Sequence, residues 1–128
     1  MISFDDLRLS DRAPIYTQLV DYVRRGVASG ALRDGEALPS RRALSALLGV
    51  NPNTVQKAYA LLEEAGLLSS RSGAVSVLTA DAAAAARIRH ELVEEAVRAA
   101  AASFRELGLE PEQAAALLKA YWGTEESI

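Results

Sequence analysis

The sequence predicts a mainly α-helical fold that includes one small β-hairpin. Half of the 128 residues are apolar and about a quarter are charged, which is the composition of a folded chain. Alanine is abundant and aromatic residues make up only 5%, so the composition favours helix over sheet. Residues that start and stop helices recur along the chain, and only one short stretch, near residue 70, has the pattern of two strands joined by a turn.

The first helix is expected from Pro14 to Gly30. Proline suits the first helical position because the N–H groups of the first turn have no acceptor within the helix, and glycine commonly ends a helix. Apolar residues recur between them at helical spacing and predict a stripe that faces the core. The stripe consists of Ile15, Leu19, Tyr22, Val23 and Val27.

Two further helices are expected close together, with a tight turn at Gly49-Val50 between them. Ser40 has the residue type of an N-cap for a short helix from Arg41 to about Leu48. Asn51-Pro52 repeats the start signal for a helix that reaches Ala65 and stops at Gly66. This succession is typical of a helix-turn-helix. The residues expected to face the core are Leu44, Leu47 and Leu48 in the first helix and Val55, Ala58, Tyr59, Leu61 and Leu62 in the second.

A β-hairpin, or wing, is expected after the second of these helices. Residues 67–70 form its first strand, Arg71-Ser72-Gly73 its turn, and residues 74–78 its return strand. Residues 1–80 are therefore predicted to form an N-terminal winged helix-turn-helix domain that binds DNA.

A two-helix segment is predicted for residues 81–128. Asp81 is expected to cap a helix from Ala82 to Leu107, which would be about 40 Å long. Its apolar stripe is longer than one small domain can bury, and a last helix from Pro111 to Trp122 is also apolar on one face, so we expect a homodimer interface here. Tyr121 and Trp122 have a second interpretation as the lining of a cleft between subunits that admits a small-molecule effector. The expected interface residues are Ile88, Leu92, Ala96, Ala100, Phe104, Leu107, Leu117, Leu118, Tyr121 and Trp122.

The composition argues against several other classes of protein. Cysteine is absent and only one histidine is present, which excludes disulfides, thiolate metal sites and a cysteine nucleophile. No arrangement of nucleophile, base and orienting group is evident, so we expect neither an enzyme nor a metal or cofactor. No stretch approaches the roughly 20 apolar residues of a membrane span. Asp5 and Asp6 stand where a signal peptide is basic, and we expect a cytoplasmic protein that does not associate with membranes.

The distribution of charge favours a nucleic-acid partner although the net charge is −3. Residues 1–80 hold nine Lys/Arg against eight Asp/Glu, whereas residues 81–128 hold five against nine. Between Leu38 and Tyr59 there are three basic residues and no acidic residue. Because phosphate binding needs a locally basic face rather than a basic chain, this segment predicts contact with double-stranded DNA.

Several spaced motifs between about residues 10 and 80 resemble the GntR family of bacterial transcription regulators. They include Pro14-Ile15-Tyr16-x-Gln18-Leu19, Leu38-Pro39-Ser40-x-Arg42-x-Leu44 and Ala58-Tyr59-x-x-Leu62-Glu63-x-x-Gly66-Leu67. The run from Asn51 to Lys57 and the short C-terminal segment with Gly108-Leu109-x-Pro111-Glu112 resemble the YtrA subfamily. The resemblance implies a repressor that dimerises through its C-terminal helices. This chain departs from the family at Pro52 and Gln56, where arginine is common, at Arg41, where glutamate is usual, and at Val75, where the wing usually has a glycine.

The DNA contacts are expected around the two helix starts and the wing tip. The N-terminal turns of a recognition helix enter the major groove, where Asn and Gln pair with adenine and Thr contacts phosphate or a thymine methyl group. Asn51 also has the simpler interpretation of a helix cap. Arg42 is a DNA contact by resemblance, Lys57 is expected to reach phosphate, and a wing-tip arginine suits a narrow minor groove. The predicted DNA-binding residues are Ser40, Arg41, Arg42, Asn51, Asn53, Thr54, Gln56, Lys57, Arg71, Ser72 and Gly73. The competing function is a protein-interaction module that does not bind DNA.

Overall fold

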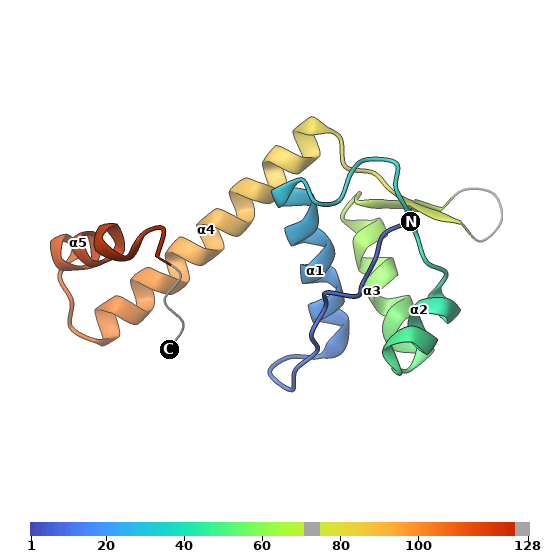
Figure 1. The fold of residues 1–128 in the computed structure, drawn as a ribbon, viewed down its shortest axis with the longest axis horizontal. Coiled ribbons are helices and arrows are strands. Elements are labelled where there is room, and N and C mark those ends of the chain that lie inside the picture. The colour runs from blue at the N-terminus through green and yellow to red at the C-terminus, as the bar shows by residue number, and fades with distance from the viewer. Residues whose placement is uncertain (71–74, 125–128) are drawn as a thin grey trace. The chain divides into compact units, whose positions relative to one another are not determined.

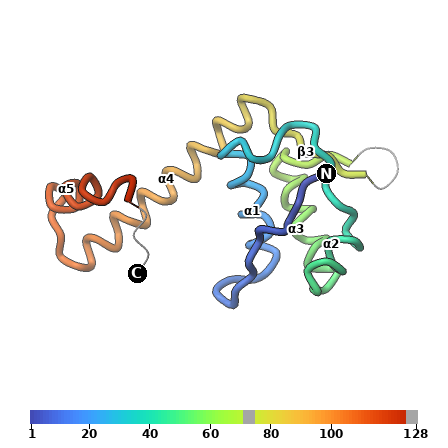
Figure 2. The backbone as a smooth tube through the Cα atoms, viewed as in Figure 1, coloured from blue at the N-terminus to red at the C-terminus, as the bar shows by residue number. Residues whose placement is uncertain are grey.

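The computed structural model describes residues 1–70 and 75–124. The predicted wing tip, Arg71-Ser72-Gly73, lies outside these residues. The chain divides into two compact units, Met1–Leu92 and Val93–Ile128. The described residues form five helices and three short strands, shown in Figures 1 and 2. They are α1 (Ile15–Ser29), β1 (Ala37–Leu38), α2 (Arg41–Leu48), α3 (Pro52–Glu64), β2 (Leu68–Ser70), β3 (Ser76–Leu78), α4 (Ala82–Glu106) and α5 (Pro111–Tyr121). The predicted fold class, mainly helical with a small β-wing, is confirmed.

The starts of α2 and α3 follow the capping signals in the sequence. The Ser40 hydroxyl accepts a hydrogen bond from the Ala43 backbone N–H at 3.0 Å. The Asn51 side-chain oxygen accepts from the Asn53 N–H at 2.8 Å, and Pro52 occupies the first turn. Gly49 lies between the two helices at φ +67°, a left-handed conformation that residues with a side chain rarely adopt. These local preferences fix the turn between α2 and α3.

The wing belongs to a three-stranded antiparallel sheet in the order β1-β3-β2. Leu68 pairs with Leu78 in the hairpin, and Leu38 pairs with Ser76 on the other side of β3. The sequence did not predict β1, because a two-residue strand has no periodicity of its own and forms only by pairing with a segment far along the chain. This third strand connects the start of α2 to the base of the wing.

The core of the first unit lies between α1, α3 and the sheet. Leu44, Val55 and Tyr59 are completely or almost completely buried. Leu47 and Leu61, however, are 60% and 36% exposed, so the prediction that they face the core is wrong. Helix α2 has only two turns, and it turns Leu44 and Ser45 inward instead of Leu47. The other core side chains between α1 and the end of β3 are Leu19, Val23, Val27, Leu38, Ala58, Leu62, Leu67, Leu68 and Leu78.

The N-terminal segment and the first turns of α4 also belong to this core. Ile2 and Phe4 are buried, and the Ile2 N–H donates to the Ala37 carbonyl at 2.8 Å. Ile88 and Leu92 are 3% and 9% exposed and lie in the same cluster. The structure thus corrects their assignment to the dimer interface, because their own chain already buries them. It also moves the end of the first unit from residue 80 to Leu92.

An ion pair reinforces the attachment of α4 to the first unit. The Arg24 Nη2 atom on α1 lies 3.3 Å from Glu91 Oε2 on α4. Asp81 caps α4 as predicted, accepting from the Ala84 N–H at 2.9 Å. The contacts of Glu91, Ile88 and Leu92 explain why the first turns of a long helix belong to the winged-helix unit.

The second unit consists of the remainder of α4 and α5. Gly108, at φ +80°, follows the end of α4. A capping box then starts α5, in which the Glu110 N–H donates to the Gln113 side-chain oxygen at 2.9 Å. Ala114 is the one buried apolar residue of α5. None of the helices in the described part of the chain is long and apolar enough to cross a membrane.

Candidate nucleic-acid interface

The outward face of α3 carries polar side chains over its first half. Asn53, Gln56 and Lys57 are exposed, while Val55 and Ala58 are buried on the opposite face. Thr54 is half-buried at the edge of this surface. No acidic residue occurs in α3 before Glu63. The structure thus places Asn53, Gln56 and Lys57, three of the predicted contact residues, at accessible positions in the first half of α3, which carries no acidic residue.

Ser40 and Asn51 are both exposed, and the side-chain oxygen of each caps a helix by accepting a hydrogen bond from a backbone N–H. An oxygen that accepts from a backbone N–H is less available to DNA, although the Asn51 amide nitrogen is a separate donor. The structure therefore supports capping as a role of both residues.

Replacing Asn51 separates capping from DNA contact. We expect Asn51→Ala to lower the free energy of unfolding by about 1 kcal/mol, because the Asn53 N–H loses its acceptor. Asn51→Asp keeps an acceptor oxygen there and should leave stability within a few tenths of a kcal/mol. Urea unfolding of both variants measures the difference. Equal losses of stability in the two variants would contradict a capping role.

Arg41 and Arg42, which are adjacent in sequence, lie in different surroundings. Arg42 is exposed, whereas Arg41 is half-buried with its guanidinium carbon 5.2 Å from the centre of the Tyr59 ring. The Tyr59 hydroxyl donates to the Pro39 carbonyl at 2.7 Å. Burial raises the pKa of Tyr59 well above its ordinary value, against a smaller opposing effect of the Arg41 charge, so the hydroxyl stays protonated and keeps this bond. Arg41 is consequently held on a fixed aromatic surface.

Lys57 also contacts an aromatic ring. Its Nζ atom lies 4.0 Å from the centre of the Tyr16 ring, so the lysine joins α3 to α1 through a cation–π contact. Lys57 is nevertheless exposed, so its ammonium group lies at the protein surface. Tyr16 itself is half-buried and packs against the core of the first unit.

A polar hollow of about 540 Å³ lies between the start of α2, the outer side of α3 and the end of β2. It brings together Arg41 and Gln56, which the sequence predicted as separate DNA contacts. Its other lining residues are Ala60, Glu63, Glu64 and Ser70. The sequence did not identify the two glutamates as part of this surface, because their position depends on how α3 packs against the wing.

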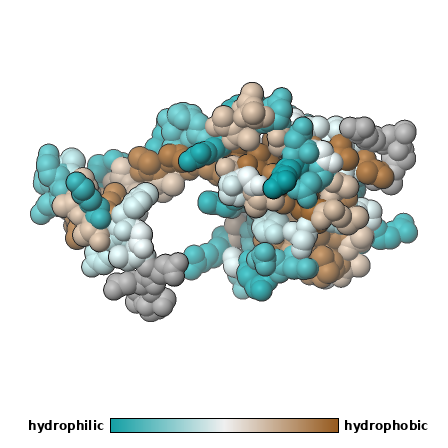
Figure 3. Space-filling view, turned by 45° about the horizontal axis from the view of Figure 1, so that its top comes forward, coloured by the Kyte–Doolittle hydropathy of each residue, from teal (hydrophilic) through white to brown (hydrophobic). Residues whose placement is uncertain are grey.

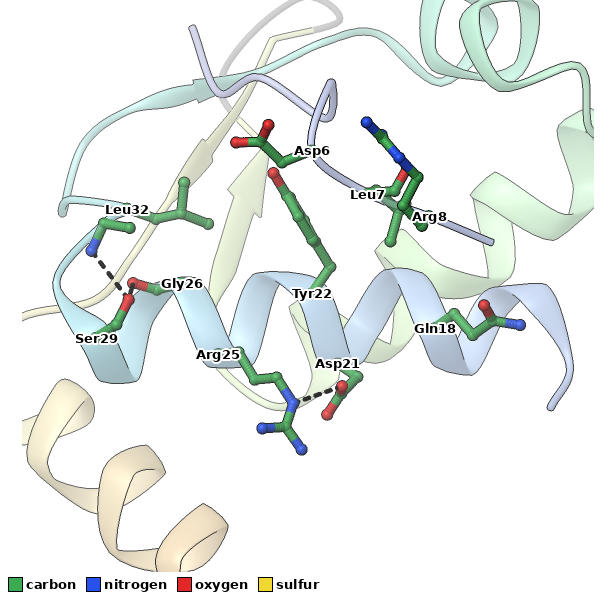
Figure 4. A pocket seen from close by; sticks show the side chains of 11 residues that line it. Asp6, Leu7, Arg8, Gln18, Asp21, Tyr22, Arg25, Gly26, Ser29 and Leu32 are labelled. Carbon is green, nitrogen blue, oxygen red and sulfur yellow. Dashed lines mark hydrogen bonds and ion pairs between the residues drawn. The ribbon is translucent and has the colours of Figure 1, made fainter. Parts of the chain in front are cut away.

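A second hollow, of about 510 Å³, lies between the N-terminal segment and α1 (Figure 4). Asp21 and Arg25 form an ion pair of 2.7 Å along α1, and the Tyr22 hydroxyl donates to the Ser3 carbonyl at 2.9 Å. Burial, aided by Asp6 and Asp5, raises the pKa of Tyr22. Acidic and basic groups alternate in its lining, so this hollow does not offer the basic surface that phosphate requires.

The second unit contains an apolar groove of about 1020 Å³ between α4 and α5. Five of the predicted interface residues line it, namely Ala96, Ala100, Phe104, Leu118 and Trp122. The other three in this unit, Leu107, Leu117 and Tyr121, are 74%, 49% and 60% exposed. Apolar residues (brown) are visible along this part of the surface in Figure 3. Such an extent of exposed apolar side chains is typical of a surface that another molecule covers.

The comparisons with known proteins agree with this geometry. The model of the family described as bacterial regulatory proteins, gntR family, matches residues 15–76, from α1 to β3. A GntR family transcriptional regulator from Listeria monocytogenes is similar over 88% of this chain and 98% of its own, at 30% identity and a TM-score of 0.79. YtrA from Sulfolobus acidocaldarius, a GntR-family transcription factor, is similar over 77% of this chain and 99% of its own, at 33% identity and a TM-score of 0.56.

Two curated proteins from Bacillus subtilis are also similar in sequence. The chain is 29% identical to the uncharacterised HTH-type transcriptional regulator YhcF over 84% of this chain and 89% of YhcF. It is 38% identical to the HTH-type transcriptional repressor YtrA over 47% of this chain, and this match spans 46% of YtrA. These relatives are named as transcription regulators and not as enzymes. The chain therefore belongs to the GntR family of bacterial transcription regulators, in its YtrA subfamily, and carries the helix-turn-helix DNA-binding domain of that family.

Proposed function

We propose that the chain is a cytoplasmic repressor that binds a palindromic DNA operator as a homodimer. The observation that carries the proposal is the acid-free first half of α3, with Asn53, Gln56 and Lys57 at accessible positions. Arg41 and Arg42 at the start of α2 add positive charge beside it. The name of YtrA from B. subtilis as a repressor supports repression as the outcome of binding.

Within this interface, the type of each side chain indicates whether it reads the DNA bases or contacts the DNA phosphates. The amides of Asn53 and Gln56 suit base edges in the major groove, whereas Lys57 and Arg42 suit phosphates. Thr54 is suited to either. Ser40 and Asn51 mainly hold the helix starts in position. The wing tip, Arg71-Ser72-Gly73, is proposed to contact the minor groove on the basis of its sequence alone.

The second unit, residues 93–128, is proposed to form the dimer interface. Val93, Val97 and Trp122 are 53%, 61% and 82% exposed, and a second copy of this chain offers an equally apolar surface to cover them. A two-fold dimer presents two identical recognition helices, so the half-sites must be inverted repeats spaced by about one helical turn or a multiple of it. The apolar groove lined by Trp122 is the proposed binding site for a small-molecule effector.

Gln56→Ala tests the proposed reading of sequence. We expect this variant to lose about 1–3 kcal/mol of binding free energy on the operator and little on random duplex, because the amide contacts a base edge and not the backbone. The operator here is the sequence that the wild-type chain selects from a random duplex pool. Binding isotherms on both duplexes give the operator-to-random ratio. An unchanged ratio would refute reading by Gln56.

The salt dependence of wild-type binding tests the proposed function itself. Binding to random duplex should weaken steeply with salt, because each neutralised phosphate releases counterions. Titrations of one fluorescent duplex between about 50 and 200 mM salt give the slope. No measurable binding at the lowest salt would favour the competing function, a winged-helix module that contacts proteins instead of DNA.

A further inference from the structure

We propose that Tyr16 is a positioning residue of the DNA interface, and that its ring holds the ammonium group of Lys57 in place for contact with a DNA phosphate. This inference rests on the proposed contact of Lys57 with DNA, and it adds α1 to an interface that otherwise consists of α2, α3 and the wing. Three features of the described residues support it: the cation–π contact itself, the charge around Lys57, and the anchoring of the first turn of α1.

The cation–π contact restricts a side chain that is otherwise flexible. Lysine carries its charge on four methylene groups, and an exposed lysine loses much rotamer freedom when it binds a phosphate. The Lys57 Nζ atom lies 4.0 Å from the centre of the Tyr16 ring. Because an ammonium group has three N–H donors, one can face the ring while the others face a phosphate. Part of the ordering that phosphate binding requires is therefore complete in the free chain.

The ring contact leaves the charge of Lys57 uncompensated. None of the ion pairs among the described side chains includes Lys57. Helix α1 has no acidic residue in its first turn, and α3 has none before Glu63. A carboxylate in the place of Tyr16 would also position the lysine, but it would cancel the charge that attracts a phosphate and releases counterions. An aromatic ring positions the ammonium group and preserves its charge.

Tyr16 is itself held in place at the start of α1. It is half-buried and packs against the core of the first unit. Two residues along the chain, the Gln18 amide nitrogen donates to the carbonyls of Ser10 and Ala13 at 2.9 and 2.8 Å, and the Gln18 amide oxygen accepts from the Ser10 N–H at 2.9 Å. These bonds tie the first turn of α1 to the segment before it and oppose the fraying that is common at helix ends. The ring is therefore a fixed support for the lysine.

Two variants at position 16 separate the ring from the hydroxyl group. Tyr16→Leu keeps an apolar side chain and removes the ring, and we expect it to weaken binding to random duplex about 2- to 5-fold, the range that an exposed cation–π contact supplies. Tyr16→Phe keeps the ring and is the matched control, so it should bind like the wild type. Fluorescence titrations measure the affinities, and urea unfolding checks that both variants fold. Equal losses in the two variants, or no loss in Tyr16→Leu, would overturn the inference.

A double-mutant cycle shows whether Tyr16 acts through Lys57. We expect Lys57→Ala to weaken binding to random duplex and to lower its salt slope by about one. Tyr16→Leu should then cause no further loss, because the ammonium group that the ring positions is gone. Additive losses would indicate a merely structural role of Tyr16 and overturn the inference, while leaving the DNA contact of Lys57 intact. If Lys57→Ala alone had no effect, the proposed contact would be refuted and the inference with it.

NMR of lysine labelled with ¹³C provides a test in the wild-type chain. The chain has two lysines, Lys57 and Lys119, and Lys119 is exposed without a ring contact in the part of the chain that the structure describes. The ring current of Tyr16 should shift the ε-methylene protons of Lys57 upfield of those of Lys119. We expect this shift to persist when duplex is added, because the ammonium group contacts ring and phosphate together. A Lys57 signal at the position of Lys119, or one that moves there on binding, would overturn the inference even if Tyr16→Leu fails to fold.

Discussion

Replacing Ile88 by alanine is expected to destabilise the winged-helix unit by about 2–5 kcal/mol. Ile88 lies on α4, outside the winged helix-turn-helix predicted from sequence, yet it is 3% exposed and packs in the same cluster as Phe4 and Leu78. The shortened side chain loses its burial and leaves a cavity in that cluster. Denaturant unfolding at a fixed protein concentration measures the loss, because the stability of a dimer also depends on concentration.

Arg89→Ala is the matched control, since it truncates the next residue of the same helix on its exposed side. It should change the free energy of unfolding by less than about 0.5 kcal/mol. If Ile88→Ala kept its stability but dissociated the dimer, Ile88 would belong to the subunit interface, as the sequence alone suggested.

Introducing a charge at Val97 is expected to have the largest effect on DNA binding. Val97 is 61% exposed and lines the apolar groove between α4 and α5. A lysine there would be buried without a partner in a dimer that covers this surface, so Val97→Lys should dissociate the dimer. A monomer holds only one half-site, and operator affinity should fall about 10²- to 10⁴-fold through the loss of bivalent binding. Analytical ultracentrifugation and operator titration measure the two effects.

Ala99→Lys adds the same charge on another side of α4. Ala99 is exposed and does not line the groove. We expect this variant to remain dimeric and to bind the operator like the wild type. A monomeric Ala99→Lys, or a dimeric Val97→Lys with full affinity, would place the interface elsewhere.

Local signals in the sequence were sufficient to predict the helix starts and the position of the wing. Ser40, Asn51 and Asp81 cap the helices that their residue types predict, because capping involves only neighbouring backbone groups. The periodicity of α1 likewise identified Leu19, Val23 and Val27 as core residues. These features depend on a few consecutive residues, which is why the sequence alone reveals them.

Features that depend on contacts between distant segments were not predicted. Strand β1 forms only by pairing with β3, and Ile2 reaches the core because its N–H bonds to Ala37. The burial of Ile88 and Leu92 has the same origin: their stripe on α4 is continuous in sequence, but its first part packs within the first unit. Periodicity shows which face of a helix is apolar and does not show what covers it.

In the candidate site, too, the sequence predicted the features that depend on neighbouring residues and not those that depend on contacts between helices. The sequence predicted Arg41 and Gln56 as contact residues from their positions at helix starts. It did not reveal that Tyr59 supports Arg41 or that the two residues share a hollow, because both facts depend on the packing of α2 against α3. Lys57 was assigned to phosphate without its contact to Tyr16, for the same reason.

Selection of bound sequences from a random duplex pool by the wild-type chain tests the central claim most directly. The claim is that two copies of the chain present two identical α3 helices to one operator. The account predicts that the selected duplexes share an inverted repeat, with half-site centres about one helical turn, or a multiple of it, apart. Enrichment of a single asymmetric site, or no enrichment above the starting pool, would contradict it.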